Sequence, residues 1–217
     1  MDALKLLCQC ISPTSNTEAL SLYIACTDDL DWEAVVFCSG QHLVTPALAY
    51  YLKEKGLFAA LKPELQDYLD QIYDVNLSRN KQIKKQLLTL LPDFNRAGIE
   101  PVLLKGIASL FDGLYETQAI RILGDIDILI AEDKLTLATD IMFKHGYRYD
   151  PALPETLSTE KHLPPFVHAN QATYIEIHRN PVALNYSGWV NAKSALKQSL
   201  TVQLETGVVK IPSVEFR

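Results

Sequence analysis

The sequence predicts an α+β protein, with a helical N-terminal part over residues 1–97 followed by a small mixed β-sheet flanked by helices over residues 98–217. Three observations support this fold class. Apolar residues recur at three- and four-residue spacing through the first part, as on the buried face of a helix. After Gly98 the apolar runs become short and alternate with polar residues, as in strands. A helix-like segment between two such runs indicates a strand-helix-strand order.

The N-terminal helices have clear start and stop signals. Capping side chains at 15–16, and again at 29 or 31, predict the starts of two helices, the second of which extends over residues 32–56. From Pro63 onward, apolar residues keep helical spacing for about eight turns. This pattern predicts one long helix that ends near Gly98.

The C-terminal part begins with two predicted strands. Residues 99–106 form an apolar run with the length of a buried strand, and residues 107–115 return to helical spacing. Residues 121–131 form the second strand. A further helix is predicted from Asp133 to Gly146, because the apolar spacing becomes helical again and glycine commonly ends helices.

Two β-hairpins are predicted in the remaining sequence. Residues 165–169 are expected to pair with the alternating segment 173–179, and residues 199–212 are expected to fold back on themselves at 205–207. Ser213 has the character of a helix N-cap, although the sequence ends four residues later. We therefore expect the chain to be truncated before a C-terminal helical part.

Charge and composition exclude several classes of function. The formal net charge is -6 and the pI about 5.4, so the chain lacks the basic surface of a general nucleic-acid-binding protein. The N-terminus does not have the charge pattern of a signal peptide, and no apolar run approaches the roughly 18 residues that span a membrane. The four cysteines form no C-x-x-C pair that would suggest a zinc site. We expect a cytoplasmic protein.

Two aspartates interrupt an otherwise apolar strand. In G-D-I-D-I-L-I, Asp125 and Asp127 lie on the same side of the strand, about 6.6 Å apart along the backbone, while Ile126 and Ile128 face the core. Adjacent carboxylates repel each other, so this arrangement makes sense if a cation lies between them. Glu176 occupies a similar position in Y-I-E-I-H. If the two strands are neighbours in the sheet, three carboxylates converge.

Carboxylate ligands of this kind suit Mg²⁺ or Mn²⁺, which retain water and bridge to phosphate oxygens. Three carboxylates can hold two such ions about 4 Å apart. An Asp-x-Asp pair by itself also fits an exposed strand end. The interpretation as a metal site therefore rests on its combination with Lys105-Gly106, Arg121 and Glu176.

The order of these motifs resembles a known family. V-L-L-K-G, an arginine four residues before D-I-D-I-L-I, and then I-E-I-H are similar to the bacterial uncharacterised nucleotidyltransferases, a branch of the DNA polymerase beta-like nucleotidyltransferase superfamily. The resemblance implies a minimal mixed sheet flanked by helices. It also implies metal-dependent transfer of a nucleoside monophosphate from a nucleoside triphosphate (NTP), such as ATP, to an acceptor that is a small molecule or a protein.

The resemblance implies roles for the three carboxylates. Asp125 and Asp127 would bind the metals, and Glu176 would share in metal binding and orient or deprotonate the acceptor hydroxyl. His178, two residues beyond Glu176, would contact the carboxylates or the acceptor, although an ordinary hydrogen-bonded histidine fits equally well. His162 and His168 lie in a predicted loop, where surface histidines are the default interpretation and a substrate-gating role is the alternative.

Positive or hydrogen-bonding groups are also needed for a triphosphate. After the first strand, most of the superfamily has Gly-Ser or Gly-Gly, whereas this sequence has Lys105-Gly106, with Ser109 one turn later. These residues are expected to contact the phosphates. Arg121 is expected either to contact phosphate or to pair with one of the carboxylates. This sequence departs from the common superfamily pattern here, and the gap from Gly106 to Asp125 is longer than usual.

Two other functions remain open at this point. A catalytically inactive interaction or regulatory module would keep the fold, but it would have no need for three carboxylates that repel one another. A metal-dependent phosphodiester hydrolase would use the same carboxylates, but Lys105-Gly106 favours triphosphate binding. A protein partner is compatible with each of these functions.

Overall fold

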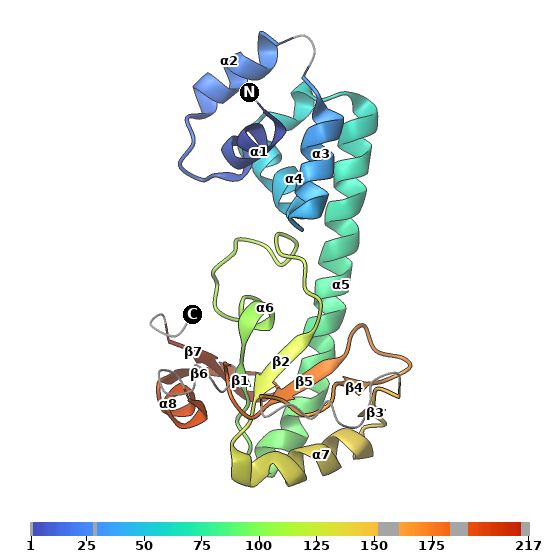
Figure 1. Ribbon diagram of the computed structural model, residues 1–217, viewed down its shortest axis with the longest axis vertical. Helices are drawn as coiled ribbons and strands as arrows, with labels where there is room; N and C mark the ends of the chain where they lie inside the picture. Colours follow the sequence, from blue (N-terminus) through green and yellow to red (C-terminus); the bar gives the residue numbers. More distant parts are fainter. Residues whose placement is uncertain (1, 28–29, 152–160, 183–190, 214–217) are drawn as a thin grey trace. The chain divides into compact units, whose positions relative to one another are not determined.

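The computed structural model describes residues 2–27, 30–151, 161–182 and 191–213, which form two compact units. The first unit comprises Met1–Asn80 and Thr117–Ile122, and the second comprises Lys81–Glu116 and Leu123–Arg217. The two units share one helix, α5, because the division falls between residues 80 and 81 (Figure 1). The α+β fold class predicted from the sequence is confirmed.

The first unit is built from helices around a core of leucines that includes Leu6, Leu48, Leu52 and Leu69. Its helices are α1 (Ala3–Ile11), α2 (Thr17–Ala25), α3 (Trp32–Gln41), α4 (Thr45–Glu54), the short 3₁₀ helix η1 (Phe58–Ala60) and the beginning of α5 (Pro63–Arg96). The first three begin at side-chain caps, in which Asp2, Asn16 and Asp31 accept a hydrogen bond from a backbone N–H of the first turn. α5 has the start and length predicted from the sequence.

The single helix predicted over residues 32–56 is wrong, because the chain breaks between α3 and α4. Leu43 adopts a left-handed backbone conformation with φ of 56°. The new helix starts at Thr45 with Pro46 in its first turn, where the missing N–H of proline costs no hydrogen bond. A buried hydrogen bond between the hydroxyls of Ser39 and Thr45, 2.9 Å long, holds the corner together.

A segment from later in the chain is bound to α5 within the first unit. The Nδ2 group of Asn76 donates to the carbonyl oxygens of Ala119 and Arg121, at 2.6 and 3.1 Å. One turn further along, the Nδ2 group of Asn80 donates to the carbonyl oxygens of Gln118 and Arg121, at 2.6 and 2.7 Å. These four bonds satisfy carbonyl groups in a segment that has no regular secondary structure.

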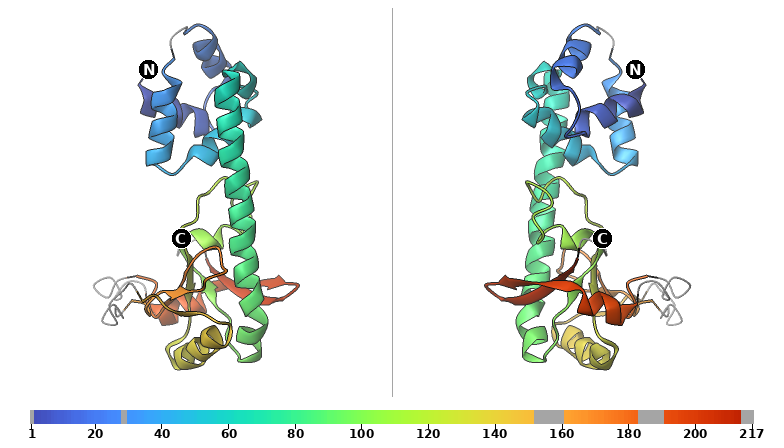
Figure 2. Two further views of the ribbon diagram at one scale, coloured as in Figure 1. Left: turned by 90° about the vertical axis from the view of Figure 1, so that its right-hand side faces the viewer. Right: turned by 90° about the vertical axis from the view of Figure 1, so that its left-hand side faces the viewer.

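Among the described residues, the second unit contains a seven-stranded mixed sheet with the order β3-β4-β5-β2-β1-β7-β6. The hairpin of β6 and β7, drawn in red, extends from this sheet in both views of Figure 2. The strands are β1 (Val102–Leu103), β2 (Ile126–Leu129), β3 (Arg148–Tyr149), β4 (Phe166–Val167), β5 (Ile175–His178), β6 (Ser199–Leu204) and β7 (Gly207–Pro212). The helical segments are α6 (Lys105–Ala108), η2 (Glu132–Lys134), α7 (Leu135–Lys144), α8 (Ala192–Lys197) and the end of α5. Both predicted hairpins are confirmed, because β4 pairs with β5 and β6 pairs with β7.

The longer helix predicted over residues 107–115 is wrong, since α6 ends at Ala108. Gly113 adopts a left-handed conformation with φ of 69°, and the side chain of Asp112 accepts a hydrogen bond from the N–H of Leu114. This local turn competes with helix formation, as Asp-Gly pairs commonly do. The residues that follow continue without regular structure toward β2.

The main core of the second unit fixes which side of the sheet carries polar groups. Ile126 and Ile128 of β2 join a buried cluster with Ile175 and Ile177 of β5 and with apolar side chains of α5 and α7. On β2 the residues between them must therefore point to the other face. There, Leu129 packs with Ala195 of α8 in a smaller cluster. Among the residues described, no helix is both long and apolar enough to cross a membrane.

Gln86 of α5 connects the main core to the start of β5. It is buried, its Nε2 group donates to the carbonyl oxygen of Thr173 at 2.7 Å, and its Oε1 atom accepts from the Thr173 N–H at 3.2 Å. The Thr173 hydroxyl in turn donates to the carbonyl oxygen of Gly124, just before β2. The entries of β2 and β5 are thereby held together.

We expect Gln86→Ala to lower the free energy of unfolding by about 1–3 kcal/mol, because both backbone groups of Thr173 lose their partner. Urea unfolding followed by circular dichroism measures this change. Gln82→Ala is the matched control, since Gln82 lies one turn earlier on α5 and is exposed. Equal stability of the two variants would show that Gln86 does not hold the start of β5.

Candidate functional site

The site is built on the pairing of β2 with β5. These strands are parallel neighbours, and Asp127 is the direct register partner of Glu176. Because side chains alternate along each strand, both carboxylates emerge on the face opposite the main core. The side chain of Asp127 is only 1% exposed and that of Glu176 is 15% exposed. The pairing therefore places two negative charges side by side in a largely buried position.

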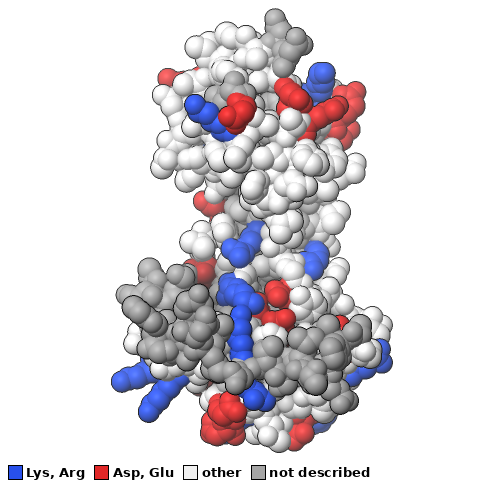
Figure 3. Space-filling model, in the orientation of Figure 1, with Lys and Arg blue, Asp and Glu red and all other residues white. Residues whose placement is uncertain are grey.

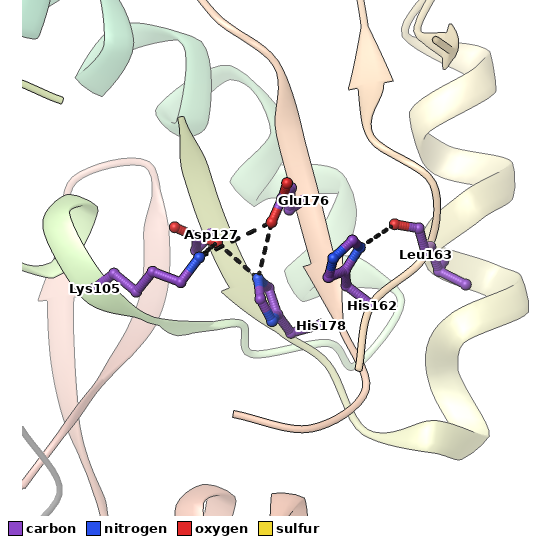
Figure 4. Close-up of polar contacts among 6 residues, drawn as sticks. All are labelled: Lys105, Asp127, His162, Leu163, Glu176 and His178. Carbon is purple, nitrogen blue, oxygen red and sulfur yellow. Dashed lines mark hydrogen bonds and ion pairs between the residues drawn. The ribbon is translucent and has the colours of Figure 1, made fainter. Parts of the chain in front are cut away.

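Two basic side chains contact these carboxylates (Figure 4). The Lys105 ammonium lies 2.5 Å from Asp127 Oδ1 and 3.9 Å from Glu176 Oε2. His178 Nε2 lies 2.7 Å from the same Asp127 oxygen and 3.4 Å from Glu176 Oε2. A buried carboxylate requires such partners, because removing an ion from water without compensation is costly.

Lys105 reaches Asp127 because of an unusual backbone position. It lies two residues after the end of β1, at the start of α6, and has a left-handed conformation, with φ of 51°. The preceding residue is fixed to β2, since the N–H of Leu104 donates to the carbonyl oxygen of Asp127 at 2.9 Å. A non-glycine residue in this region of φ costs on the order of 1 kcal/mol, and the ion pair with Asp127 offsets part of that cost.

The three carboxylates differ in electrostatic environment. Partial burial and the charge of Asp127 raise the pKa of Asp125 above its ordinary value. Burial also acts to raise the pKa of Asp127, but hydrogen bonds from His178 and Lys105 outweigh it and hold that pKa below its ordinary value. The hydrogen bond with His178 is the main reason that the pKa of Glu176 is lowered. Asp125 is therefore the member of the group that takes up a proton most readily.

The pKa values of the two basic partners, His178 and Lys105, are shifted in the opposite direction to those of Asp127 and Glu176. Burial by itself would lower the pKa of His178 and of Lys105, but hydrogen bonds and ion pairs with the carboxylates outweigh it, and both pKa values are raised. The Nδ1 atom of His178 is buried and has no hydrogen-bond partner among the described residues. His178 thus presents one ring nitrogen, Nε2, to both Asp127 and Glu176.

His162 is a neighbour of the site that the sequence did not identify. It forms an isolated antiparallel bridge with His178, and the two imidazole rings are 5.4 Å apart. Its Nδ1 atom lies 2.8 Å from the carbonyl oxygen of Leu163 (Figure 4). Its charge also contributes to the lowered pKa of Glu176. A histidine in an irregular segment gives no periodic signal, so only the three-dimensional pairing reveals this position.

The other predicted nucleotide-binding residues have different surroundings. Gly106 follows Lys105 in α6, and the Ser109 hydroxyl donates to the carbonyl oxygen of Gly106 at 2.7 Å. Arg121 belongs to the first unit, where its carbonyl oxygen accepts from Asn76 and Asn80 and its side chain is exposed. Contacts of these residues with phosphate stay a prediction.

The side chains present fit a divalent cation. Ligand atoms of Asp127, Glu176 and His178 all lie within 4.8 Å of one another. The two carboxylate oxygens suit Mg²⁺ or Mn²⁺, whereas the imidazole nitrogen is a ligand that suits transition metals. Asp125 is close enough to Asp127 that each affects the charge of the other.

This arrangement defines a class of protein with an acidic centre on adjacent strands of a mixed sheet. The model of the uncharacterised nucleotidyltransferase family matches residues 28–217, and the chain belongs to this family. Among solved structures, a candidate nucleotidyltransferase from Thermotoga maritima is 17% identical, with 72% of this chain and 81% of that chain covered and a TM-score of 0.34. No curated protein matches the sequence.

The structure predicts different consequences for the two aspartates. Asp127→Asn removes the partner of two buried or half-buried cations, so the free energy of unfolding should fall by about 3 kcal/mol at pH near 7. Asp125→Asn should leave stability unchanged or slightly higher, because it relieves repulsion. From the sequence alone, both substitutions are expected to leave the fold intact. Urea unfolding of the two variants distinguishes these expectations.

The pH dependence of the free energy of unfolding tests whether the deficit of Asp127→Asn comes from its ion pairs. Because the folded-state pKa of Asp127 is below its ordinary value, its stabilisation is complete above that ordinary value and is lost as the pH falls through the folded-state pKa. The deficit of Asp127→Asn should therefore shrink once the pH falls below the ordinary value of 3.8. A deficit that stays constant would mean that the ion pairs do not stabilise the folded chain.

Proposed function

We propose that this protein transfers a nucleoside monophosphate from an NTP to an acceptor hydroxyl in a metal-dependent reaction. The observation that carries the proposal is the register pairing of Asp127 with Glu176, beside Asp125 and Lys105. The family membership supports the same class of reaction. Two strands that present carboxylates together, next to the ammonium group of Lys105, suit a substrate with several negative oxygens and an associated metal.

In the proposed reaction, the acceptor oxygen attacks the α-phosphorus. The bond from that phosphorus to the oxygen bridging to the β-phosphate breaks, and pyrophosphate leaves with the electron pair. Asp125, Asp127 and Glu176 would hold Mg²⁺ or Mn²⁺, which supplies the positive charge that offsets the charge developing on the phosphate oxygens. The protein's own contribution is chiefly to position the reactants.

Glu176 is assigned to the acceptor side of this reaction. It is more exposed than its register partner Asp127, and its lowered pKa keeps it ionised at neutral pH. An ionised carboxylate accepts a hydrogen bond from the acceptor hydroxyl and so orients its oxygen. The proton released on attack passes to Glu176.

Lys105 is assigned a double role. Its ammonium group contacts the same oxygen, Asp127 Oδ1, that would bind a metal ion, so the two cations compete for one ligand. With its side chain 45% exposed, Lys105 has room to turn away from Asp127 and contact a phosphate instead. When no substrate is bound, Lys105 therefore neutralises the carboxylates. When substrate is bound, Lys105 contacts the triphosphate.

We expect NTP binding to depend on both a metal ion and Asp125. Isothermal titration of ATP, GTP, CTP and UTP in the presence of Mg²⁺ should detect at least one complex that EDTA abolishes. Asp125→Asn, which should keep the fold, is expected to weaken that complex by roughly tenfold or more, or about 1.4 kcal/mol. Asp140→Asn is the control, since Asp140 is exposed on α7. Binding that is insensitive to EDTA and to Asp125→Asn would contradict the proposal.

Glu176→Gln separates binding from chemistry. We expect this variant to retain more of the affinity for NTP than of the transfer activity, measured with α-phosphate-labelled NTP, because the amide cannot take up the acceptor proton. An equal loss of affinity and transfer would assign Glu176 to the structure of the site. Transfer to water alone would favour the hydrolase.

Lys105→Met tests the competition between cations. Without nucleotide, the variant should bind Mn²⁺ roughly tenfold more tightly, because no ammonium group blocks Asp127, while its affinity for NTP should fall. Electron paramagnetic resonance of free Mn²⁺ measures the first effect, and isothermal titration measures the second. Unchanged Mn²⁺ affinity would show that Lys105 and the metal do not share Asp127.

A further inference from the structure

A groove of about 840 Å³ lies within the helical unit, between α3 and the start of α5. Its walls are formed by Trp32, Val36, Phe37 and Gly40 of α3, and by Leu65 and Tyr68 of α5. The α3 residues recur at four-residue spacing, so the groove follows that helix for more than two turns, or about 12 Å. It is lined mainly by apolar side chains and involves none of the carboxylates of β2 and β5.

Two apolar residues of this groove, Phe37 and Tyr68, are exposed, whereas Trp32, Val36 and Leu65 are partly buried against the core of the unit. The side chain of Phe37 is 70% exposed and that of Tyr68 is 44% exposed. The opposite side of α3 is also apolar, because Val35 is buried in the core of the unit. A helix with apolar residues on both sides normally has both sides covered. Single exposed apolar residues are common, but their gathering in one groove indicates a binding surface.

Gly40, the last residue but one of α3, leaves open space in the groove. A Cβ atom added at Gly40 would meet nothing within 4 Å, so no contact inside the chain requires its absence. Because glycine has no side chain, the backbone of a bound partner can approach α3 closely at this point of the groove.

Charge indicates the chemistry of the occupant. Asp31, Glu33 and Glu64 line the groove, against one basic residue, Lys62. Acidic residues also outnumber basic residues in the unit as a whole. Acidic side chains are conspicuous on the part of the first unit that is drawn at the top of Figure 3. A phosphate-bearing ligand would be repelled by this rim, whereas a basic segment would be attracted to it.

We propose that the groove binds an amphipathic helix of a partner protein, with apolar residues on one side and lysine or arginine residues along its edges. This is the helix-in-groove mode of recognition, in which apolar residues one turn apart anchor the helix. A second copy of the chain is a poorer occupant, because a symmetric contact would bring two acidic rims together. The partner helix passes over Gly40 and packs against Phe37 and Tyr68.

The probe is a fluorescein-labelled helical peptide of about 18 residues, or five turns, with leucine on one face and lysine on the other. Fluorescence anisotropy with the full chain should detect binding of this peptide and not of the same pattern with glutamate in place of lysine. Gly40→Leu fills the groove without a clash inside the chain and should weaken binding roughly tenfold or more. Phe37→Ala should weaken it as well.

Leu22→Ala is the matched control for Phe37→Ala, because Leu22 is 65% exposed in the same unit but does not line the groove. Circular dichroism establishes that Gly40→Leu is folded. The proposal is overturned if the lysine and glutamate peptides bind equally, or if Gly40→Leu binds the lysine peptide as tightly as the unmodified chain. It is also overturned if sedimentation shows a dimer that Gly40→Leu dissociates, since the groove would then belong to a second copy.

Discussion

The parallel pairing of β2 with β5 is the constraint on which the rest of the site depends. The strands meet in a register that sets Ile126 opposite Ile175 and Asp127 opposite Glu176. The first pair enters the main core, so the second must face away from it. Burial of isoleucine thus determines where the carboxylates lie. The energy that holds the site in place is mainly hydrophobic, although the site itself is charged.

The buried carboxylate of Asp127 then determines its surroundings. Its position requires positive or hydrogen-bonding partners, and both Lys105 and His178 supply them to the same oxygen. This requirement explains the left-handed backbone of Lys105, which brings the ammonium group to Asp127 at the start of α6. In the proposed reaction the carboxylate of Asp127 again requires positive charge, which Lys105 supplies before the metal ion binds and the metal ion supplies afterwards.

Local patterns in the sequence were sufficient for part of this arrangement. Alternation in D-I-D-I and I-E-I-H identified the side of each strand that carries carboxylates, because burial follows a two-residue period. The long helix α5 followed in the same way from its 3.6-residue period. The corner at Leu43 and the early end of α6 were not predicted, since each depends on a single residue that adopts a left-handed conformation.

Other features depend on pairing between distant residues, which no local period encodes. The different environments of Asp125 and Asp127 arise from contacts with Lys105 and His178, far from the aspartates in sequence. The position of His162 beside His178 likewise arises from a bridge between two segments. Spacing alone treats the two aspartates as equivalent and the histidine as part of a loop.

The shortness of β2 and β5 has a consequence for how such a chain can diverge. Each has four residues, and the two are joined by a long connection that contains α7. Residues gained or lost within that connection leave the face of every strand residue unchanged. One residue gained or lost inside either strand would exchange its two faces, sending isoleucine to the site and a carboxylate into the core. Length variation among related chains should therefore concentrate between the strands and avoid their interiors.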